Sequence, residues 1–237
     1  MARFFLIGGK DDDLKSNFIE KKLLELSFKD NPIMLYFSAA SKDNNKSINH
    51  FINTFANLKV NIIVVTLTLK EYSFNELDDL FDKADIIYFG GGNTDVLRNI
   101  ISKNNVDKLL LKYLNSNKIY AGISAGAILL CKSGMGDTYS YVDNFKTYQF
   151  KMVKGLNILD FSICPHYQKD DLYVFNDEVK DCNLAYGIED DTAIYINKFV
   201  NVFKANKKHS VYEFKNSLLK PIYPYYNSDV EAKLEKI

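Results

Sequence analysis

The sequence is poor in the residues on which disulfide-bonded, zinc-binding and membrane proteins depend. Its three cysteines, Cys131, Cys164 and Cys182, are odd in number and form no CxxC pair, which argues against a disulfide framework and against a metal site. We expect them to be small buried hydrophobic residues. The apolar run near the N-terminus spans only Phe4 to Ile7, and no later segment approaches the roughly 20 apolar residues of a membrane span. We therefore expect a cytoplasmic protein that does not bind membranes.

An excess of charge of either sign is also missing. The 237 residues include 30 Lys and Arg and 30 Asp and Glu, so the formal net charge is zero. Proteins that follow a nucleic-acid backbone usually carry a basic surface, so we expect no nucleic-acid partner. Hydrophobic residues make up 47% and charged residues 25% of the chain, which argues against disorder and against a fibrous structure. At this length we expect a single domain, residues 1–237.

Apolar residues follow two periods that alternate along the first half of the chain. Short runs such as 33–37 (IMLYF) are typical of strands buried on both faces, whereas 14–26 has the apolar stripe of a helix that packs on a sheet. The predicted strands are 3–7, 33–37, 60–67, 86–89 and 119–123, and the predicted helices are 14–26, 47–58, 75–83, 96–101 and 106–114. This alternation predicts the α/β class, with a mostly parallel sheet and helices on both faces.

The pattern changes in the second half of the chain. Residues 133–151 are polar and predict a surface loop. Short strands are predicted at 162–164, 184–188, 193–196, 200–203 and 211–214. Strands so close in sequence favour hairpins, so we expect antiparallel additions at the edge of the sheet.

The segment Gly122-Ile123-Ser124-Ala125-Gly126 lies at a junction between a strand and a helix. Glycines on both sides permit the close approach and the strained dihedral angles of a sharp turn, which would expose the serine hydroxyl. The Ala125 amide, at the start of the helix, would point toward the same space and could hold an oxyanion. Ser124 is therefore the candidate nucleophile of a serine hydrolase.

A second glycine-rich segment, Gly90-Gly91-Gly92-Asn93-Thr94, follows the strand 86–89 and precedes a helix. Backbone amides at the carboxyl end of a parallel strand can bind phosphate or supply oxyanion donors. No Walker lysine follows and GxGxxG spacing is absent, so a nucleotide cofactor is disfavoured. The alternative is a tight turn whose Asn93 or Thr94 caps the helix.

A serine nucleophile needs a base, and the chain contains only His50, His166 and His209. His166 is the best candidate because Cys164-Pro165-His166 directly follows a predicted strand, where proline can fix the loop. His50 lies on a predicted amphipathic helix and His209 in a Lys-rich turn, so we expect both to be solvated.

The base in turn needs a carboxylate that selects its tautomer. Glu189, Asp190 and Asp191 follow the strand 184–188 and could reach His166. Asp137, in the loop after the nucleophile helix, is the other contender. These observations do not decide which of the four carboxylates is the partner of His166.

Four ordered blocks resemble the peptidase family that contains bacterial aspartyl dipeptidase (peptidase E) and cyanophycinase. They are Ile7-Gly8-Gly9, Phe89-Gly90-Gly91-Gly92-Asn93-Thr94, Gly122-Ile123-Ser124-Ala125-Gly126-Ala127, and Cys164-Pro165-His166-Tyr167 followed by Gly187-Ile188-Glu189-Asp190-Asp191-Thr192-Ala193. The resemblance spans nearly the whole chain. It implies the flavodoxin-like fold of class I glutamine amidotransferases and a bacterial serine peptidase without a cofactor.

The resemblance also implies a role for each site residue. Ser124 would attack the carbonyl, His166 would relay the proton, and amides of Gly91, Gly92 and Ala125 would bind the oxyanion. The acid of the family's triad matches Asp190. Members often have glutamate at that position, so Glu189 remains an alternative.

The resemblance implies small peptide substrates, including dipeptides with an acidic first residue, but the sequence offers little to bind an acidic side chain. Arg3 and Arg98 are the only arginines, and neither lies beside a catalytic block. A lysine could replace an arginine, although a flexible point charge discriminates less sharply. The candidate lysines are Lys132, Lys146, Lys151 and Lys169. We expect cleavage of short peptides or amino-acid amides, with a weaker preference for Asp than aspartyl dipeptidases have.

Two other functions compete with a peptidase. An α/β-hydrolase esterase shares the serine elbow but has the chain order Ser, acid, His, which would require His209 as base. A catalytically silent, amidotransferase-like binding module would keep the fold without turnover. The sequence leaves the oligomeric state open and is compatible with a homodimer.

Overall fold

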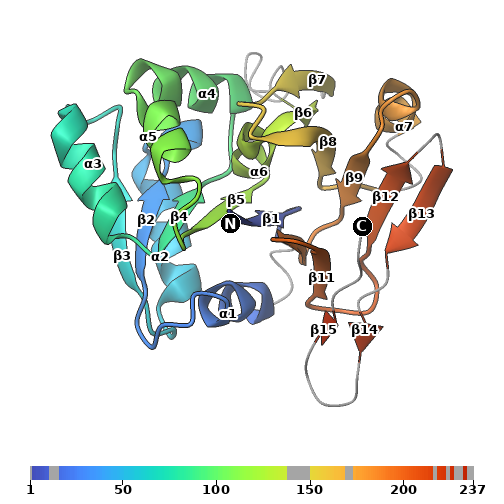
Figure 1. Ribbon diagram of the computed structural model, residues 1–237, viewed down its shortest axis with the longest axis horizontal. Coiled ribbons are helices and arrows are strands. Elements are labelled where there is room, and N and C mark those ends of the chain that lie inside the picture. Colours follow the sequence, from blue (N-terminus) through green and yellow to red (C-terminus); the bar gives the residue numbers. More distant parts are fainter. Residues whose placement is uncertain are drawn as a thin grey trace.

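The computed structural model describes residues 2–10, 16–137, 150–168, 173–215, 218–222, 225–226 and 232–233. Its main feature is a seven-stranded sheet with the order β11-β10-β1-β5-β4-β2-β3 (Figure 1). The strands are β1 (Arg3–Ile7), β2 (Ile33–Phe37), β3 (Asn61–Val65), β4 (Ile86–Phe89), β5 (Ile119–Ile123), β10 (Thr192–Ile196) and β11 (Val200–Lys204). The five strands β1 to β5 are parallel, and β10 joins β1 antiparallel and forms a hairpin with β11.

Helices cover both faces of this sheet, because its central strands are apolar on both sides. Phe4 and Leu6 belong to a core on one face, and the alternate residues Phe5 and Ile7 belong to a core on the other. The first core includes residues of α3 (Phe74–Lys83), α4 (Thr94–Lys103), α5 (Val106–Tyr113) and α6 (Ala125–Leu130), and the second includes residues of α1 (Phe18–Glu25) and α2 (Asn45–Phe55). A short 3-10 helix, η1 (Ala39–Ser41), precedes α2.

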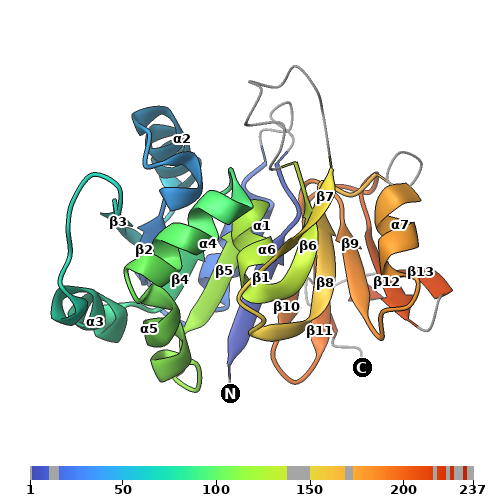
Figure 2. The same ribbon diagram turned by 90° about the horizontal axis from the view of Figure 1, so that it is seen from above.

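A second, six-stranded sheet lies beside the first, with the order β13-β12-β9-β8-β6-β7 (Figure 2). It consists of β6 (Cys131–Gly136), β7 (Lys151–Lys154), β8 (Leu159–Pro165), β9 (Ala185–Ile188), β12 (Val211–Lys215) and β13 (Leu218–Ile222). Helix α6 packs against strands of both sheets, whereas α7 (Tyr173–Val179) packs with a separate apolar cluster. The short strands β14 (Tyr225–Tyr226) and β15 (Ala232–Lys233) pair with each other.

The structure confirms the α/β class and corrects one part of the prediction. Strands 3–7, 33–37, 86–89 and 119–123 have the predicted bounds, and the hairpin β10–β11 extends the edge of the parallel sheet as expected. The predicted strands 162–164, 184–188 and 211–214, however, lie in the second sheet as β8, β9 and β12, where β8 and β9 are parallel and β12 joins β9 antiparallel. The loop expected at 133–151 begins and ends in strands, because β6 covers Cys131–Gly136 and β7 covers Lys151–Lys154; residues 138–149 lie outside the described residues. Pairing of β6 with β8 overrides the weak strand propensity of its glycines.

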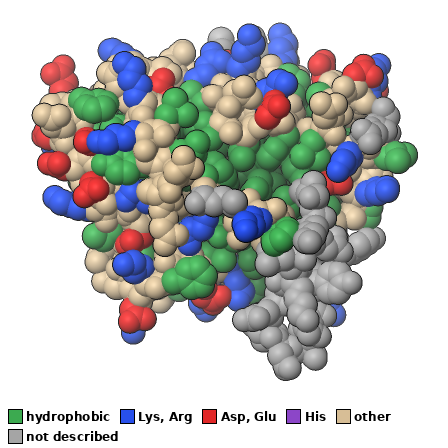
Figure 3. Space-filling model, viewed as in Figure 1, with side chains coloured by type: hydrophobic (Ala, Val, Ile, Leu, Met, Phe, Trp, Pro, Cys, Tyr) green, Lys and Arg blue, Asp and Glu red, His purple; other side chains and the backbone are tan. Residues whose placement is uncertain are grey.

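Two of the three cysteines are buried as predicted, and both signs of charge occur on the surface. Cys131 and Cys164 are buried and Cys182 is partly buried, all three as free thiols, and burial raises the pKa of the Cys131 and Cys164 thiols. Basic and acidic side chains are interspersed on the face in Figure 3, and hydrophobic side chains gather toward its middle. Within the described part of the chain, no helix is both long and apolar enough to cross a membrane.

Candidate active site

The turn between β5 and α6 holds Ser124 at the carboxyl edge of the parallel strands. Ser124 has φ 53° and ψ −117°, a sparsely populated conformation that costs about 1–3 kcal/mol. A Cβ atom on Gly122 would overlap the carbonyl of Gly126, and a Cβ atom on Gly126 would overlap the carbonyl of Phe89. The Ser124 amide donates to the carbonyl of Ile7 at 3.1 Å. The two glycines therefore let α6 pack directly on the sheet with the serine at the tip of the turn.

His166 reaches the same edge from the second sheet. It directly follows β8 and has φ 51°, and the amide of Tyr167 donates to the carbonyl of Ile188 at 3.1 Å, which holds the turn against β9. Its Nε2 lies 3.1 Å from Oγ of Ser124, within hydrogen-bond distance. The imidazole is half-exposed, so a small substrate can approach both atoms.

Asp190 contacts the other side of the imidazole. Its Oδ1 lies 2.7 Å from Nδ1 of His166. The loop that carries it is bound to the end of β1, because Gly9 forms a bridge with Asp190 and accepts a hydrogen bond from the Asp191 amide at 3.1 Å. A Cβ atom on Gly9 would overlap both the Asp190 carboxylate and the His166 ring. Gly9 is therefore a site residue that the sequence indicated only as part of a glycine pair after a strand.

The other three acids that the sequence left open have different partners. Glu189 accepts a hydrogen bond from the Ser210 amide at 2.6 Å, and burial raises its pKa. Asp191 is buried and lies 3.8 Å from Nδ1 of His209. Asp137 lines a hollow next to Ser124, and burial raises its pKa, while the nearby His166 lowers it. Among the described acids, the hydrogen bond to His166 belongs to Asp190.

The remaining histidines lie in other surroundings. His50 is exposed on α2. His209 is partly buried, with Nδ1 3.2 Å from the side-chain amide nitrogen of Asn206. Of the three histidines, the structure thus brings His166 to Ser124.

The glycine-rich segment after β4 passes beside the serine. Amides at its two ends are engaged: Gly90 donates to Phe37 and Asn93 to Ala40, each at 3.0 Å. Between them, a Cβ atom on Gly91 would lie 3.4 Å from Cβ of Ser124, and Gly92 has φ 135°. Asn93 also caps α4 by accepting from the Val96 amide at 2.9 Å, so this segment is a helix cap and a neighbour of Ser124 at once. Because Ala125 is the first residue of α6, its backbone amide has no acceptor within the helix.

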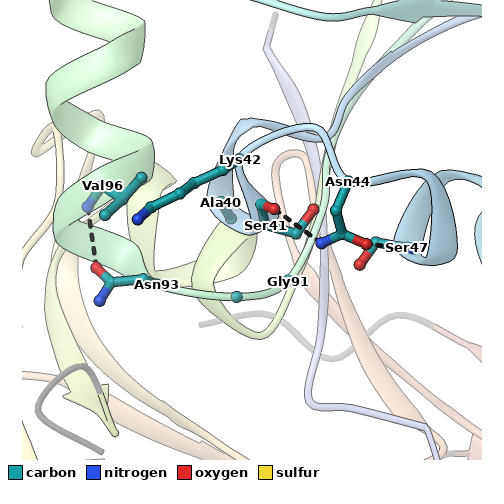
Figure 4. A pocket seen from close by; sticks show the side chains of 9 residues that line it. Ala40, Ser41, Lys42, Asn44, Ser47, Gly91, Asn93 and Val96 are labelled. Atoms are coloured by element: carbon teal, nitrogen blue, oxygen red, sulfur yellow. Dashed lines mark hydrogen bonds between the residues drawn. The ribbon is translucent and has the colours of Figure 1, made fainter. Parts of the chain in front are cut away.

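Two hollows meet at this segment, and Gly92 lines both. The smaller, of about 240 Å³, contains Ser124, His166 and Asp137. The other side chains that line it are mainly apolar and are those of Thr94, Ala125, Ile128, Met135, Phe150 and Pro165. The larger, of about 620 Å³, lies between the loop after η1 and the start of α4 (Figure 4). Its side chains are mostly polar and include Lys42, Ser41, Asn44, Ser47 and Asn93.

The cations that the sequence suggested for an acidic substrate do not line either hollow, as far as the described residues go. Arg3 donates to the carbonyls of Leu26 and Asn117, and Arg98 pairs with Asp95 at 3.5 Å. Lys132 pairs with Asp160 at 3.3 Å, and Lys151 is exposed on β7. Lys146 and Lys169 lie outside the described residues.

Comparison with known sequences points to one family. The sequence profile of peptidase family S51 matches residues 4–199. The chain is 27% identical over 187 residues to the uncharacterized peptidase YgaJ of Bacillus subtilis (strain 168), an alignment that covers 77% of this chain and 76% of that protein. It is 31% identical over 113 residues to the uncharacterized peptidase Lin0382 of Listeria innocua, where the alignment covers 46% of this chain and 52% of the relative.

Two solved structures have the same fold. A peptidase from an acI-B1 Actinobacterium superposes with a TM-score of 0.69 at 18% identity and covers 94% of both chains. A putative peptidase E protein from Listeria monocytogenes EGD-e superposes with a TM-score of 0.64 at 21% identity, covering 87% of this chain and 100% of that one.

Proposed function

The chain belongs to peptidase family S51 and is a serine peptidase, and from this premise we propose that it hydrolyses short peptides or amino-acid amides through Ser124, His166 and Asp190. One observation supports the proposal above all. The His166 ring lies between the other two side chains, 3.1 Å from Oγ of Ser124 and 2.7 Å from Oδ1 of Asp190. This is the order that nucleophile, base and orienting acid require.

In the proposed acylation step, Oγ of Ser124 bonds to the substrate carbonyl carbon and its proton moves to Nε2 of His166. Asp190 accepts a hydrogen bond from Nδ1–H, which selects the tautomer with a free Nε2 and stabilises the imidazolium. Amides of Gly91, Gly92 and Ala125 are proposed to bind the oxyanion. The carbon–nitrogen bond then breaks, and the leaving amine takes the proton from His166.

Deacylation repeats these proton movements with water. His166 removes a proton from water as its oxygen bonds to the acyl carbon, and the bond to Oγ of Ser124 breaks as the serine recovers its proton. The product acid leaves. The half-exposed imidazole is open to the water that this step needs.

Two alternatives have less support. An esterase with the α/β-hydrolase order would use His209, whose Nδ1 instead lies near Asn206 and Asp191. A silent binding module has no need for the strained serine or for the hydrogen-bonded His166–Asp190 pair.

The test compares hydrolysis of a dipeptide panel by the wild type, Ser124→Ala and His166→Ala. Each substitution should lower kcat by about 10⁴-fold or more, and the double variant should be no worse, because the two residues act as one unit. Ser102→Ala and His50→Ala, on exposed positions of α4 and α2, are matched controls that should retain activity. Loss of activity in His209→Ala but not in His166→Ala would overturn the proposed base.

A further inference from the structure

The hollow that contains Ser124 and the larger hollow next to it carry side chains of opposite charge. The smaller holds the carboxylate of Asp137, and the larger holds the ammonium group of Lys42. They adjoin at Gly92, and Gly91 passes directly beside Ser124. A substrate whose scissile carbonyl sits on Ser124 can therefore extend into both.

The backbone of the Lys42 loop is held in place, and the Lys42 ammonium group has no ion-pair partner in the described part of the chain. Lys42 and Asp43 have φ of 55° and 54°, and the loop is held by the buried carboxylate of Asp43, whose Oδ2 accepts from the amide and the hydroxyl of Thr68, both at 2.7 Å. Among the described residues, no carboxylate lies within ion-pair distance of Lys42; Asp95, on the facing helix, pairs with Arg98. In Figure 4 the Lys42 side chain extends toward the first turn of α4, where Asn93 and Val96 lie.

The surroundings of Lys42 suit a carboxylate. Hydroxyl and amide groups of Ser41, Ser47 and Asn44 line the same hollow and make it polar. The Ser41 hydroxyl donates to the Ser38 carbonyl at 2.9 Å and the Asn44 side-chain amide to the Ser41 carbonyl at 2.8 Å, so the charge-assisted bond to a substrate carboxylate would come from Lys42. A substrate ammonium group would be repelled there, and a substrate carboxylate would be repelled by Asp137 in the smaller hollow. Charge alone thus gives a dipeptide one orientation: its N-terminal residue beside Asp137 and its C-terminal residue beside Lys42.

Building on the proposed peptidase function, we propose that the larger hollow binds the C-terminal residue of a dipeptide and that Lys42 binds its free α-carboxylate. The site then selects for chains that end one residue after the scissile bond. Lys42 is in this view a specificity residue and takes no part in the chemical step.

Binding to a Ser124→Ala protein tests this without turnover. Calorimetry should show that Ala-Leu binds at least about tenfold tighter than Ala-Leu amide, because the amide lacks the charge-assisted bond. Lys42→Met and Lys42→Gln in the same background should remove this difference, and Lys42→Arg should keep most of it. Lys46→Met, an exposed position of α2 that does not line the hollow, is the matched control and should keep it in full.

Equal binding of the two ligands to the Ser124→Ala protein, or a difference that survives Lys42→Met and Lys42→Gln, would overturn the proposal. Either result would leave the peptidase proposal intact if wild type still cleaves Ala-Leu. Conversely, failure of wild type to cleave any short peptide would contradict the proposed function, and the binding difference would still decide the role of Lys42.

Discussion

Gly9 lies so close to Asp190 that no larger residue fits at position 9. A Cβ atom at Gly9 would overlap the Asp190 carboxylate and also the His166 ring, while the Gly9 carbonyl accepts from the Asp191 amide at 3.1 Å. The end of β1 is thus the surface on which the acid and the base rest. Their alignment with Ser124 depends on the absence of a single methyl group.

Gly9→Ala should lower kcat by about 100-fold, because a shift of the order of 1 Å in a catalytic group costs that much. Steady-state kinetics with a dipeptide measures it, and the thermal midpoint separates misalignment from unfolding. In a His166→Ala background, the same substitution should cause little further loss, because the overlap with the ring is gone and Asp190 acts through His166. A full additional 100-fold loss there would show that Gly9 acts on something other than the Asp190–His166 pair.

Asp190 and its neighbour Glu189 should respond differently to removal of charge. Asp190→Asn should lower kcat by about 10³–10⁴-fold, because an amide no longer favours the tautomer with a free Nε2. Glu189→Gln should leave kcat near the wild-type value, since the glutamine oxygen can still accept from the Ser210 amide. The opposite ranking in the same assay would make Glu189 the acid.

The parallel sheet and the serine turn were predictable from sequence because local signals suffice for both. Phe4 and Phe5 face different cores, and such runs of strand residues that are buried on both sides are visible as uninterrupted apolar segments. Gly122 and Gly126 mark the turn because only glycine fits there. Three strands of the second sheet were predicted, at 162–164, 184–188 and 211–214, but their assembly into a separate sheet has no local signal. One of their partners, β6, contains two glycines and becomes a strand only by pairing with β7 and β8.

The residues alone did not decide among Glu189, Asp190 and Asp191, because three adjacent acids on one turn point in different directions; only the family resemblance indicated Asp190. Here the backbone settles their contacts: Asp191 has φ 55°, and Gly9 holds the turn so that Asp190 meets His166. Nothing in the sequence indicated a binding role for Lys42, because the segment around it has only the polar composition of a surface turn. Packing of Gly92 against Ala40, 52 residues away in sequence, brings that loop to the site.

The raised pKa of the Asp137 carboxyl predicts that KM depends on pH. Burial raises its pKa above 3.8, so its carboxylate becomes protonated at a higher pH than an exposed aspartate does. Substrate ammonium binds the ionised form, so KM for dipeptides should rise as pH falls through this raised pKa. Asp137→Asn should have a higher KM at neutral pH and no such rise. Because the raised pKa disfavours the charged form in the folded state, stability of wild type relative to the variant should also fall as pH rises through the same range. A pH-independent difference in KM between the two proteins would contradict a binding role for this carboxylate.

The sizes and charges of the two hollows predict which dipeptides are cleaved best. The hollow with Asp137 measures about 240 Å³ and the hollow with Lys42 about 620 Å³. A small first residue and a large second residue should therefore be favoured, so kcat/KM for Ala-Leu should exceed that for Leu-Ala.

An acidic first side chain would face the carboxylate of Asp137, and no arginine among the described residues lines that hollow. Asp-Leu should accordingly be cleaved no better than Ala-Leu, and Asp137→Asn should improve Asp-Leu relative to Ala-Leu. Kinetics with Ala-Leu, Leu-Ala, Asp-Leu and Lys-Leu measures both effects. A strong preference for Asp-Leu in the wild type would mean that a cation outside the described residues reaches the first side chain, and it would overturn the assignment of that hollow.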